Sequence, residues 1–427
     1  MVNSTATTVI GDIALVIAIS TLLGAVLRRV GQPAVIGQML TGILLGPSLL
    51  GRLPGHLTNH LFPPSVLPAL TTLAQVGVVV FMFTVGYEID FGSLRGRGRT
   101  VPLIAASALL VPMSLGIACV LVFRSRFVAL GEVHSGRSFV LFMGVAVSIT
   151  ALPVLAALIR ERDLAGTPIG IISTAAAGIM DVLAWLLLAA ALIGTGHGAR
   201  FSLPATILLT CGFVVVMLAV IRPALSWSTS RSQSILSSPV LIAFMLALGS
   251  AWVTASLGLQ PIFGGLLAGL AMRGRRMPPD ATVLRSMDQA GRLLLPLFFI
   301  ATGLVLDVGS VHGLALALLM LFIVVSAAGK LGPAYVVARL CGLEARPSAA
   351  IAALVNTRGL TELIALNVGL TAGLIHQRLF TVLVLMALVN TLATAPLLTM
   401  IRPAGAPQAD AANAANAADA ALPVSMR

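Results

Sequence analysis

The chain has 427 residues, of which 58% are hydrophobic and only 9% are charged. Soluble domains carry about 25% charged residues, so this composition excludes a water-soluble globular protein whose surface faces solvent. The net charge of +12 does not indicate a nucleic-acid partner, because the arginines lie in short loops between apolar runs, where they follow membrane topology.

The apolar runs are mostly about 17–28 residues long, which suits helices that cross a hydrocarbon core of roughly 30 Å. The sequence predicts an all-α integral membrane protein. The first run has no basic leader or clear cleavage site, and we interpret it as a retained helix. The ninth is short and glycine-rich, which favours a half-helix or a closely packed one. The thirteen predicted segments are 9–28, 33–51, 66–88, 100–123, 138–159, 167–194, 203–222, 238–256, 259–272, 291–307, 311–339, 348–373 and 377–401.

An odd number of segments places the two termini on opposite sides of the membrane. Most loop arginines fall on the side that includes the C-terminus, so the positive-inside rule predicts an outside N-terminus and a cytoplasmic C-terminus in the cell membrane. Residues 1–402 are expected to form the membrane domain. Residues 403–427 are rich in Ala, Asn and Asp, and we expect them to be a disordered cytoplasmic tail.

Two segments contain helix-breaking residues at corresponding places. The fifth contains Ser148, Thr150 and Pro153, and the twelfth contains Asn356 and Gly359. The two segments are seven apart, so a unit of segments 1–6 and a unit of segments 8–13 would face opposite ways. Paired interrupted helices in inverted repeats indicate a transporter with its binding site near the membrane midplane.

Asp181 lies in the sixth segment, about 20 Å from either end at 1.5 Å per residue. A charge at such a depth is expensive and needs a partner or a function. Protonated, the side chain is neutral; deprotonated, it can hold a hard monovalent cation beside hydroxyl and carbonyl oxygens. The alternative is that Asp181 forms a structural ion pair with Lys330. The sequence allows both interpretations, an ion-binding group and a structural pair.

Three further charges lie inside segments. Lys330 is the only lysine in the chain, and an ammonium group, unlike a guanidinium, can release its proton when buried. It is interpreted as a charge-compensating or proton-releasing group, or else as a side chain that extends towards the membrane surface. Arg358 and Glu362 are four residues apart on one helical face, which favours a structural ion pair that holds the broken helix. Asp12 is interpreted as a helix-start residue.

Five motifs are distributed along the chain, at Gln32–Gly37, Gly42–Ser48, Ser148–Leu155, Leu297–Leu304 and Asn356–Leu363. With these motifs the chain resembles, over about residues 10–400, the monovalent cation:proton antiporter-2 family, which includes Kef-type systems and plant cation/proton exchangers.

This resemblance implies the sodium/proton-antiporter fold, in which two broken helices cross between inverted six-helix repeats. It also implies a homodimer and an elevator-like movement. In that family the sixth segment carries the ion-binding acid, which Asp181 matches. Many members have a second acid where this chain has Met180, and that acid pairs with the membrane lysine. Lys330 therefore lacks its usual partner, and we expect it to turn towards Asp181.

The leading hypothesis is one-for-one exchange of Na⁺ or K⁺ against H⁺, in which both ions compete for Asp181. Thr150 and Ser148 are candidate co-ligands, and Met180 is the site's departure from the family pattern. One alternative is a transporter of the same fold that moves an organic compound or an ion–ionophore complex. Another is a membrane sensor without transport. No resident cofactor and no enzymatic activity are expected, because the sequence shows no nucleophile triad, metal cluster or phosphate loop.

Overall fold

The computed structural model describes residues 2–52, 61–88, 98–130, 136–193, 203–225, 238–257, 261–273 and 280–401, and every regular element in these ranges is a helix. The first half contains α1 (Val2–Arg29), α2 (Ala34–Leu45), η1 (Leu50–Arg52), α4 (Leu67–Glu88), α5 (Thr100–Val122), α6 (Arg124–Ala129), α7 (Arg137–Ser148), α8 (Leu152–Glu161) and α9 (Pro168–Ile193). The second half contains α10 (Leu203–Val216), η3 (Met217–Ile221), α12 (Pro239–Ser256), α13 (Pro261–Met272), α14 (Ala281–Gly303), η4 (Val308–Ser310), α15 (Leu314–Leu340), α16 (Ala345–Val355), α17 (Leu360–Thr371) and α18 (Gln377–Ile401).

The membrane segments agree with the prediction from hydropathy. In the described residues, 12 spans are long and apolar enough to cross a bilayer, and the shorter apolar helix α13 corresponds to the predicted ninth segment. Its 12 residues extend about 18 Å, which is less than the hydrocarbon thickness. A side chain on Gly265 or Gly269 of α13 would run into the backbone of α4, so close packing keeps this short helix in place.

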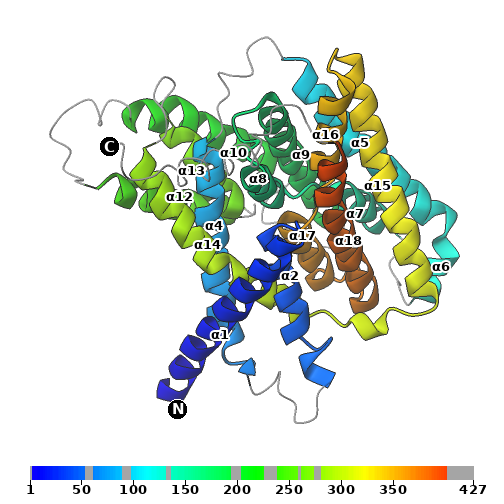
Figure 1. The fold of residues 1–427 in the computed structure, drawn as a ribbon, viewed down its shortest axis with the longest axis horizontal. Helices are drawn as coiled ribbons and strands as arrows, with labels where there is room; N and C mark the ends of the chain where they lie inside the picture. Colours follow the sequence, from blue (N-terminus) through cyan, green and yellow to red (C-terminus); the bar gives the residue numbers. More distant parts are fainter. Residues whose placement is uncertain are drawn as a thin grey trace, which may run out of the picture.

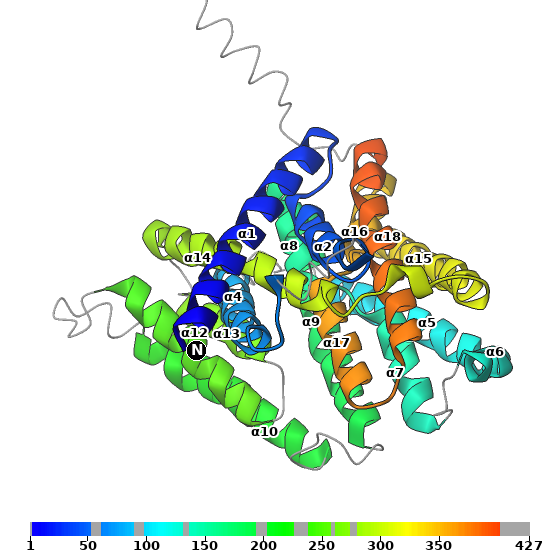
Figure 2. The ribbon, with the colours of Figure 1, turned by 90° about the horizontal axis from the view of Figure 1, so that it is seen from below.

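The helices form two bundles (Figures 1 and 2). The scaffold bundle contains α1, α2, α4, α12, α13 and α14, which pack mainly on one another. The core bundle contains α5, α7, α8, α9, α15, α16, α17 and α18, and it holds most of the largest cluster of buried apolar side chains. In both views the two bundles lie on opposite sides, with α2, α8, α9 and α17 near the middle.

Two predicted positions need correction. The tenth segment was predicted at 291–307, but α14 begins at Ala281, because Asp280 caps it by accepting hydrogen bonds from the N–H groups of Thr282 and Val283 at 2.7 and 3.3 Å. Hydropathy misses this charged first half. Asp12 is not a helix-start residue, since α1 begins at Val2. It lies inside α1 as a buried side chain, and its Oδ2 has no hydrogen-bond partner in the described residues.

The predicted tail, residues 403–427, lies outside the described residues, as do several of the loop arginines that set the predicted topology. The disorder of the tail and the orientation of the termini therefore stay predictions.

Candidate functional site

The two predicted interruptions are real breaks, and they meet inside the core bundle. The first separates α7, which ends at Ser148, from α8, which begins at Leu152. The second separates α16, which ends at Val355, from α17, which begins at Leu360.

Hydrogen bonds to backbone groups join the breaks. The N–H of Ala151 donates to the carbonyl oxygen of Thr357 at 3.0 Å, and the hydroxyl of Thr361 donates to the carbonyl oxygen of Thr150 at 3.2 Å. These bonds satisfy backbone groups that no helix can pair.

Local sequence explains how each break is made. Pro153 lies in the first turn of α8, where its missing N–H leaves no helical bond unmade. Gly359 has a φ of 141°, in a region that side-chain-bearing residues rarely enter. It precedes α17 directly. Asn356 directly follows α16 as its buried C-cap residue, and its Oδ1 has no hydrogen-bond partner in the described residues.

Lys330 lies at the ends of both broken helices. Its Nζ donates to the carbonyl oxygen of Ile149 at 2.8 Å, donates to the hydroxyl of Thr150, and lies 3.5 Å from the carbonyl oxygen of Val355. Ile149 directly follows α7 and Val355 ends α16, so the ammonium group faces two helix C-termini. Such ends carry partial negative charge, and the cation offsets it.

Arg358 and Glu362 form an ion pair at 2.9 Å, with both side chains fully buried. The guanidinium of Arg358 also donates to the carbonyl oxygens of Ala146 and Val147, in the last turn of α7. Arg358 therefore ties the second broken helix to the C-terminal end of the first. A buried charge held this way has both a counter-ion and hydrogen-bond partners.

Asp181 lies in the middle of α9 and is 1% exposed. The backbone N–H of Leu152, at the start of α8, faces its carboxylate, which favours negative charge there. The geometry falls short of a hydrogen bond, and neither carboxylate oxygen has a hydrogen-bond partner in the described residues. Lys330 does not turn to Asp181 as expected, because its hydrogen bonds go to the breaks. An unpartnered carboxylate of this kind can accept a proton or a cation.

Of the two predicted co-ligands, Thr150 lies next to the neighbour of Asp181 in the chain, whereas Ser148 is bonded within its own helix. The hydroxyl oxygen of Thr150 lies 3.8 Å from the Sδ of Met180, next to Asp181 in the chain, and 2.9 Å from the carbonyl oxygen of Val355, to which it donates. Thr150 thus joins α9 to both breaks. The hydroxyl of Ser148 instead donates back to the carbonyl oxygen of Val145 at 2.9 Å, within its own helix. No hydrogen bond joins Ser148 to the carboxylate of Asp181, whose two oxygens have no hydrogen-bond partner in the described residues.

Several polar residues around the breaks are absent from the prediction. Thr361 binds the first break, and Thr391 and Asn390 of α18 contact the second break and α15. A hydroxyl in a membrane helix usually binds the carbonyl oxygen one turn earlier, as Thr381 and Thr394 do here. The sequence does not distinguish a threonine that bonds within its own helix from one that bonds a break. These residues could therefore not be predicted without the fold.

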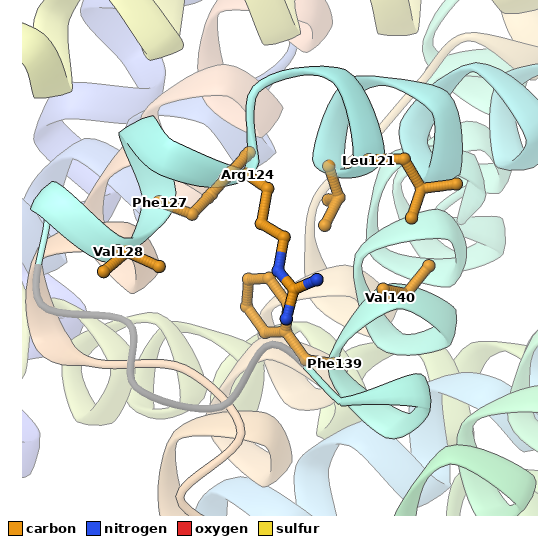
Figure 3. Close-up of a pocket in the computed structure, with 7 residues that line it drawn as sticks. Leu121, Arg124, Phe127, Val128, Phe139 and Val140 are labelled. Carbon is orange, nitrogen blue, oxygen red and sulfur yellow. The ribbon is translucent and has the colours of Figure 1, made fainter.

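One small cavity lies away from these residues. It has a volume of about 30 Å³, enough for one or two water molecules, and the Arg124 side chain points into it (Figure 3). It is lined by Val120, Leu121, Arg124, Phe127, Val128, Phe139 and Val140 from α5, α6 and α7. A cavity of about 10 Å³ is lined by residues of α2, α14, α17 and α18, among them Met39.

Comparison with known proteins agrees with this architecture. The protein titled sodium proton antiporter MjNhaP1 from Methanocaldococcus jannaschii superposes with a TM-score of 0.67, covering 92% of this chain and 96% of that chain at 14% identity. At that identity the match establishes the sodium/proton-antiporter fold.

Sequence relatives extend the comparison. Cation/H(+) antiporter 20 of Arabidopsis thaliana is 36% identical over 396 residues, which cover 90% of this chain and 47% of that protein. The K(+)/H(+) antiporter 1 of Saccharomyces cerevisiae is 30% identical over 91% of this chain and 46% of its own. This chain thus spans about half the length of these relatives. These relatives are named as transporters, not enzymes.

A bacterial relative matches from end to end. The Na(+)/H(+) antiporter NhaS4 of Synechocystis sp. is 34% identical over 95% of this chain and 100% of its own length. The family model for the transmembrane sodium/hydrogen exchangers matches residues 15–400. The paired breaks, the buried acid in the middle of α9 and these matches agree, and the chain belongs to the sodium/hydrogen exchanger family of monovalent cation:proton antiporters.

Proposed function

We propose that this protein exchanges Na⁺ or K⁺ for H⁺ across the cell membrane, and that the two ions compete for the carboxylate of Asp181. The observation that carries the proposal is that both oxygens of this fully buried carboxylate lack a hydrogen-bond partner in the described residues. Leaving such a group unpartnered is costly. A bound proton or a bound cation each removes that cost, and the two cannot occupy the same oxygens together.

Charge balance in the core bundle supports one-for-one exchange. The buried charges described there are Asp181, Glu362, Lys330 and Arg358, and they cancel when all four are ionised. A proton or a monovalent cation on Asp181 therefore gives loaded states of equal charge. While Lys330 keeps its proton, exchange of one for the other moves no net charge. With one free acid, the remaining candidate for a second proton carrier is Lys330.

Thr150 is the proposed co-ligand of the cation, together with unwound carbonyl oxygens of the first break. Hard cations prefer oxygen ligands, and the Thr150 hydroxyl lies beside Met180. Lys330 already donates to that hydroxyl, so the cation shares this oxygen with the ammonium group. Ser148 is a weaker candidate, because its hydroxyl is bonded within α7.

Alternating access requires the core bundle to move, because Asp181 is 1% exposed in this arrangement. We propose an elevator-like displacement of the core bundle against the scaffold bundle in a homodimer, with residues 1–402 as the transporter domain. The N-terminus is proposed to lie outside, and residues 403–427 are proposed to be a disordered cytoplasmic tail.

Proton movement in everted vesicles, followed by fluorescence dequenching on addition of Na⁺ or K⁺, tests the proposal. Asp181→Asn is expected to reduce the signal to background, whereas the same change at the exposed Asp163 leaves it at the wild-type level. Full activity in Asp181→Asn would reject the mechanism. A wild-type signal that neither cation saturates would instead support the alternative of an organic cargo.

A further inference from the structure

Two consecutive buried residues of α18, Asn390 and Thr391, contact two different parts of the site. They are 2% and 1% exposed. Successive side chains on a helix point about 100° apart, so the two reach different neighbours. Thr391 reaches the second break, and Asn390 reaches α15, the helix that carries Lys330. The hydroxyls of Thr381 and Thr394 on the same helix are satisfied by hydrogen bonds within α18, so a bond from α18 to another helix is not needed to satisfy a hydroxyl there.

The hydroxyl of Thr391 is a hydrogen-bond partner for the backbone N–H and carbonyl groups of Arg358. Arg358 lies between α16 and α17, so its N–H and carbonyl groups have no helical bond. Its N–H donates to Thr391 Oγ1 at 3.0 Å, and this hydroxyl lies 2.8 Å from its carbonyl oxygen. Thr391 Oγ1 is also 2.9 Å from the carbonyl oxygen of Ala387. The hydroxyl's one proton serves one of these carbonyls at a time.

The amide of Asn390 anchors the helix of the other buried cation. Its Nδ2 donates to the hydroxyl oxygen of Ser326 at 2.8 Å. Ser326 is fully buried on α15, four residues before Lys330 and hence on the same helical face. This bond fixes how α15 is placed against α18 one turn away from the ammonium group.

We propose that Asn390 and Thr391 are positioning residues of the ion site. Thr391 acts through the backbone of Arg358, whose guanidinium binds the C-terminal end of α7. Asn390 acts through Ser326 and α15, whose ammonium group binds Thr150. Together they set where the two buried cations lie relative to Asp181. This inference rests on the proposed function, because its readout is the affinity of the site for cation and proton.

The decisive variant is Thr391→Val, which keeps the shape and removes the hydroxyl. Loss of a buried hydrogen bond that leaves the N–H of Arg358 unpartnered shifts an equilibrium by about tenfold. The cation concentration that gives half-maximal proton movement in vesicles is expected to rise by about that factor, and the pH midpoint is expected to shift. Thr391→Ser restores the hydroxyl and should stay within about twofold of wild type.

Thr381→Val is the matched control. Thr381 is a buried residue of the same helix, and its hydroxyl binds the carbonyl oxygen of Gln377 in its own helix at 3.0 Å. The control should leave half-saturation and pH midpoint unchanged. Equal shifts in Thr391→Val and Thr381→Val, or no shift in Thr391→Val, would overturn the proposal.

Ser326→Ala tests the positioning role of Asn390 independently, including the case in which Thr391→Val does not fold. It removes the acceptor of Asn390 with little change in volume, and half-saturation should rise severalfold; an unchanged value would overturn the role of Asn390. Asp181→Asn distinguishes failure of the positioning role from failure of the proposed function. If it abolishes exchange while Thr391→Val and Ser326→Ala behave as wild type, the positioning role fails and the proposed function stands.

Discussion

The ammonium group of Lys330 donates to the hydroxyl of Thr150, not to the carboxylate of Asp181. Its other partners are carbonyl oxygens at the ends of α7 and α16. The positive charge thus lies at helix C-termini, and the carboxylate faces the N–H at the start of α8. Each charge is placed where a helix end of opposite sign favours it. Asp181 stays available because its potential counter-ion is engaged elsewhere.

Met180→Asp is expected to make exchange voltage-sensitive. A second acid beside Asp181 offers a second proton site and a counter-ion for Lys330, so the cation-loaded and proton-loaded states no longer carry equal charge. At 60 mV, one uncompensated charge corresponds to about 1.4 kcal/mol. Proteoliposomes with an imposed potential measure the effect. The wild type and Met180→Leu should be insensitive, and voltage sensitivity of the wild type would contradict the charge balance proposed here.

Lys330→Met is expected to lower thermal stability. The substitution leaves the carbonyl oxygen of Ile149 and the hydroxyl of Thr150 without their charged donor, at a cost of about 2 kcal/mol or more. Melting of the purified protein in detergent measures this loss. Cys341→Ala, outside the breaks, serves as the control. A melting temperature equal to that of the wild type would show that Lys330 does not hold the breaks together.

Gly359→Ala should destabilise the protein by about 1–3 kcal/mol, because φ at this position is 141° and few L-residues adopt it. The added Cβ would also lie 2.7 Å from Cγ2 of Val154. The companion variant Val154→Ala relieves only the contact, so the double variant should recover part of the loss. Gly249→Ala on α12 meets no atom within 4 Å and should have no such effect on the melting temperature.

Arg160 connects the bundles and is expected to hold this arrangement closed. On α8, its Nε donates to Glu88 of α4 at 2.8 Å and its Nη1 donates to Asp288 of α14 at 2.8 Å. Arg160→Gln removes both ion pairs and leaves two carboxylates facing the core bundle. A cysteine placed at Met39, in the cavity between the bundles, should then react severalfold faster with an impermeant thiol reagent.

The control for this variant is Arg339→Gln, since the hydrogen bond that Arg339 makes within the described residues is local, to the carbonyl oxygen of Leu343 at 2.7 Å. Exchanging the charges in Arg160→Glu/Glu88→Arg should slow the labelling again, although the pair with Asp288 is not restored. Labelling at the wild-type rate in Arg160→Gln would mean that the network does not hold the bundles together. The native cysteines Cys119, Cys211 and Cys341 are replaced first.

The amino-acid sequence by itself determined the membrane spans, the two breaks and the place of Asp181 in the middle of its helix. Span length and hydropathy are local properties, because each helix satisfies its own backbone groups in lipid. Pro153 and Gly359 act on their own backbone torsions, so their effects are also local. The short helix α13 was also predicted, because the apolar run at 259–272 is short and rich in glycine. The i, i+4 spacing of Arg358 and Glu362 was enough to bring their charges within 2.9 Å.

Only the tertiary structure decided the partners of Lys330, the start of α14 and the role of α18. The ammonium group binds Ile149 and Thr150, about 180 residues away in the chain, and that contact exists only after the breaks cross. The charged start of α14 is supported by Arg160 of a distant helix. Thr391 looks like any back-bonded threonine until Arg358 is placed against it. Local sequence leaves several chemically equivalent hydrogen-bond partners for such a side chain, and the long-range packing of the helices determines which of them it binds.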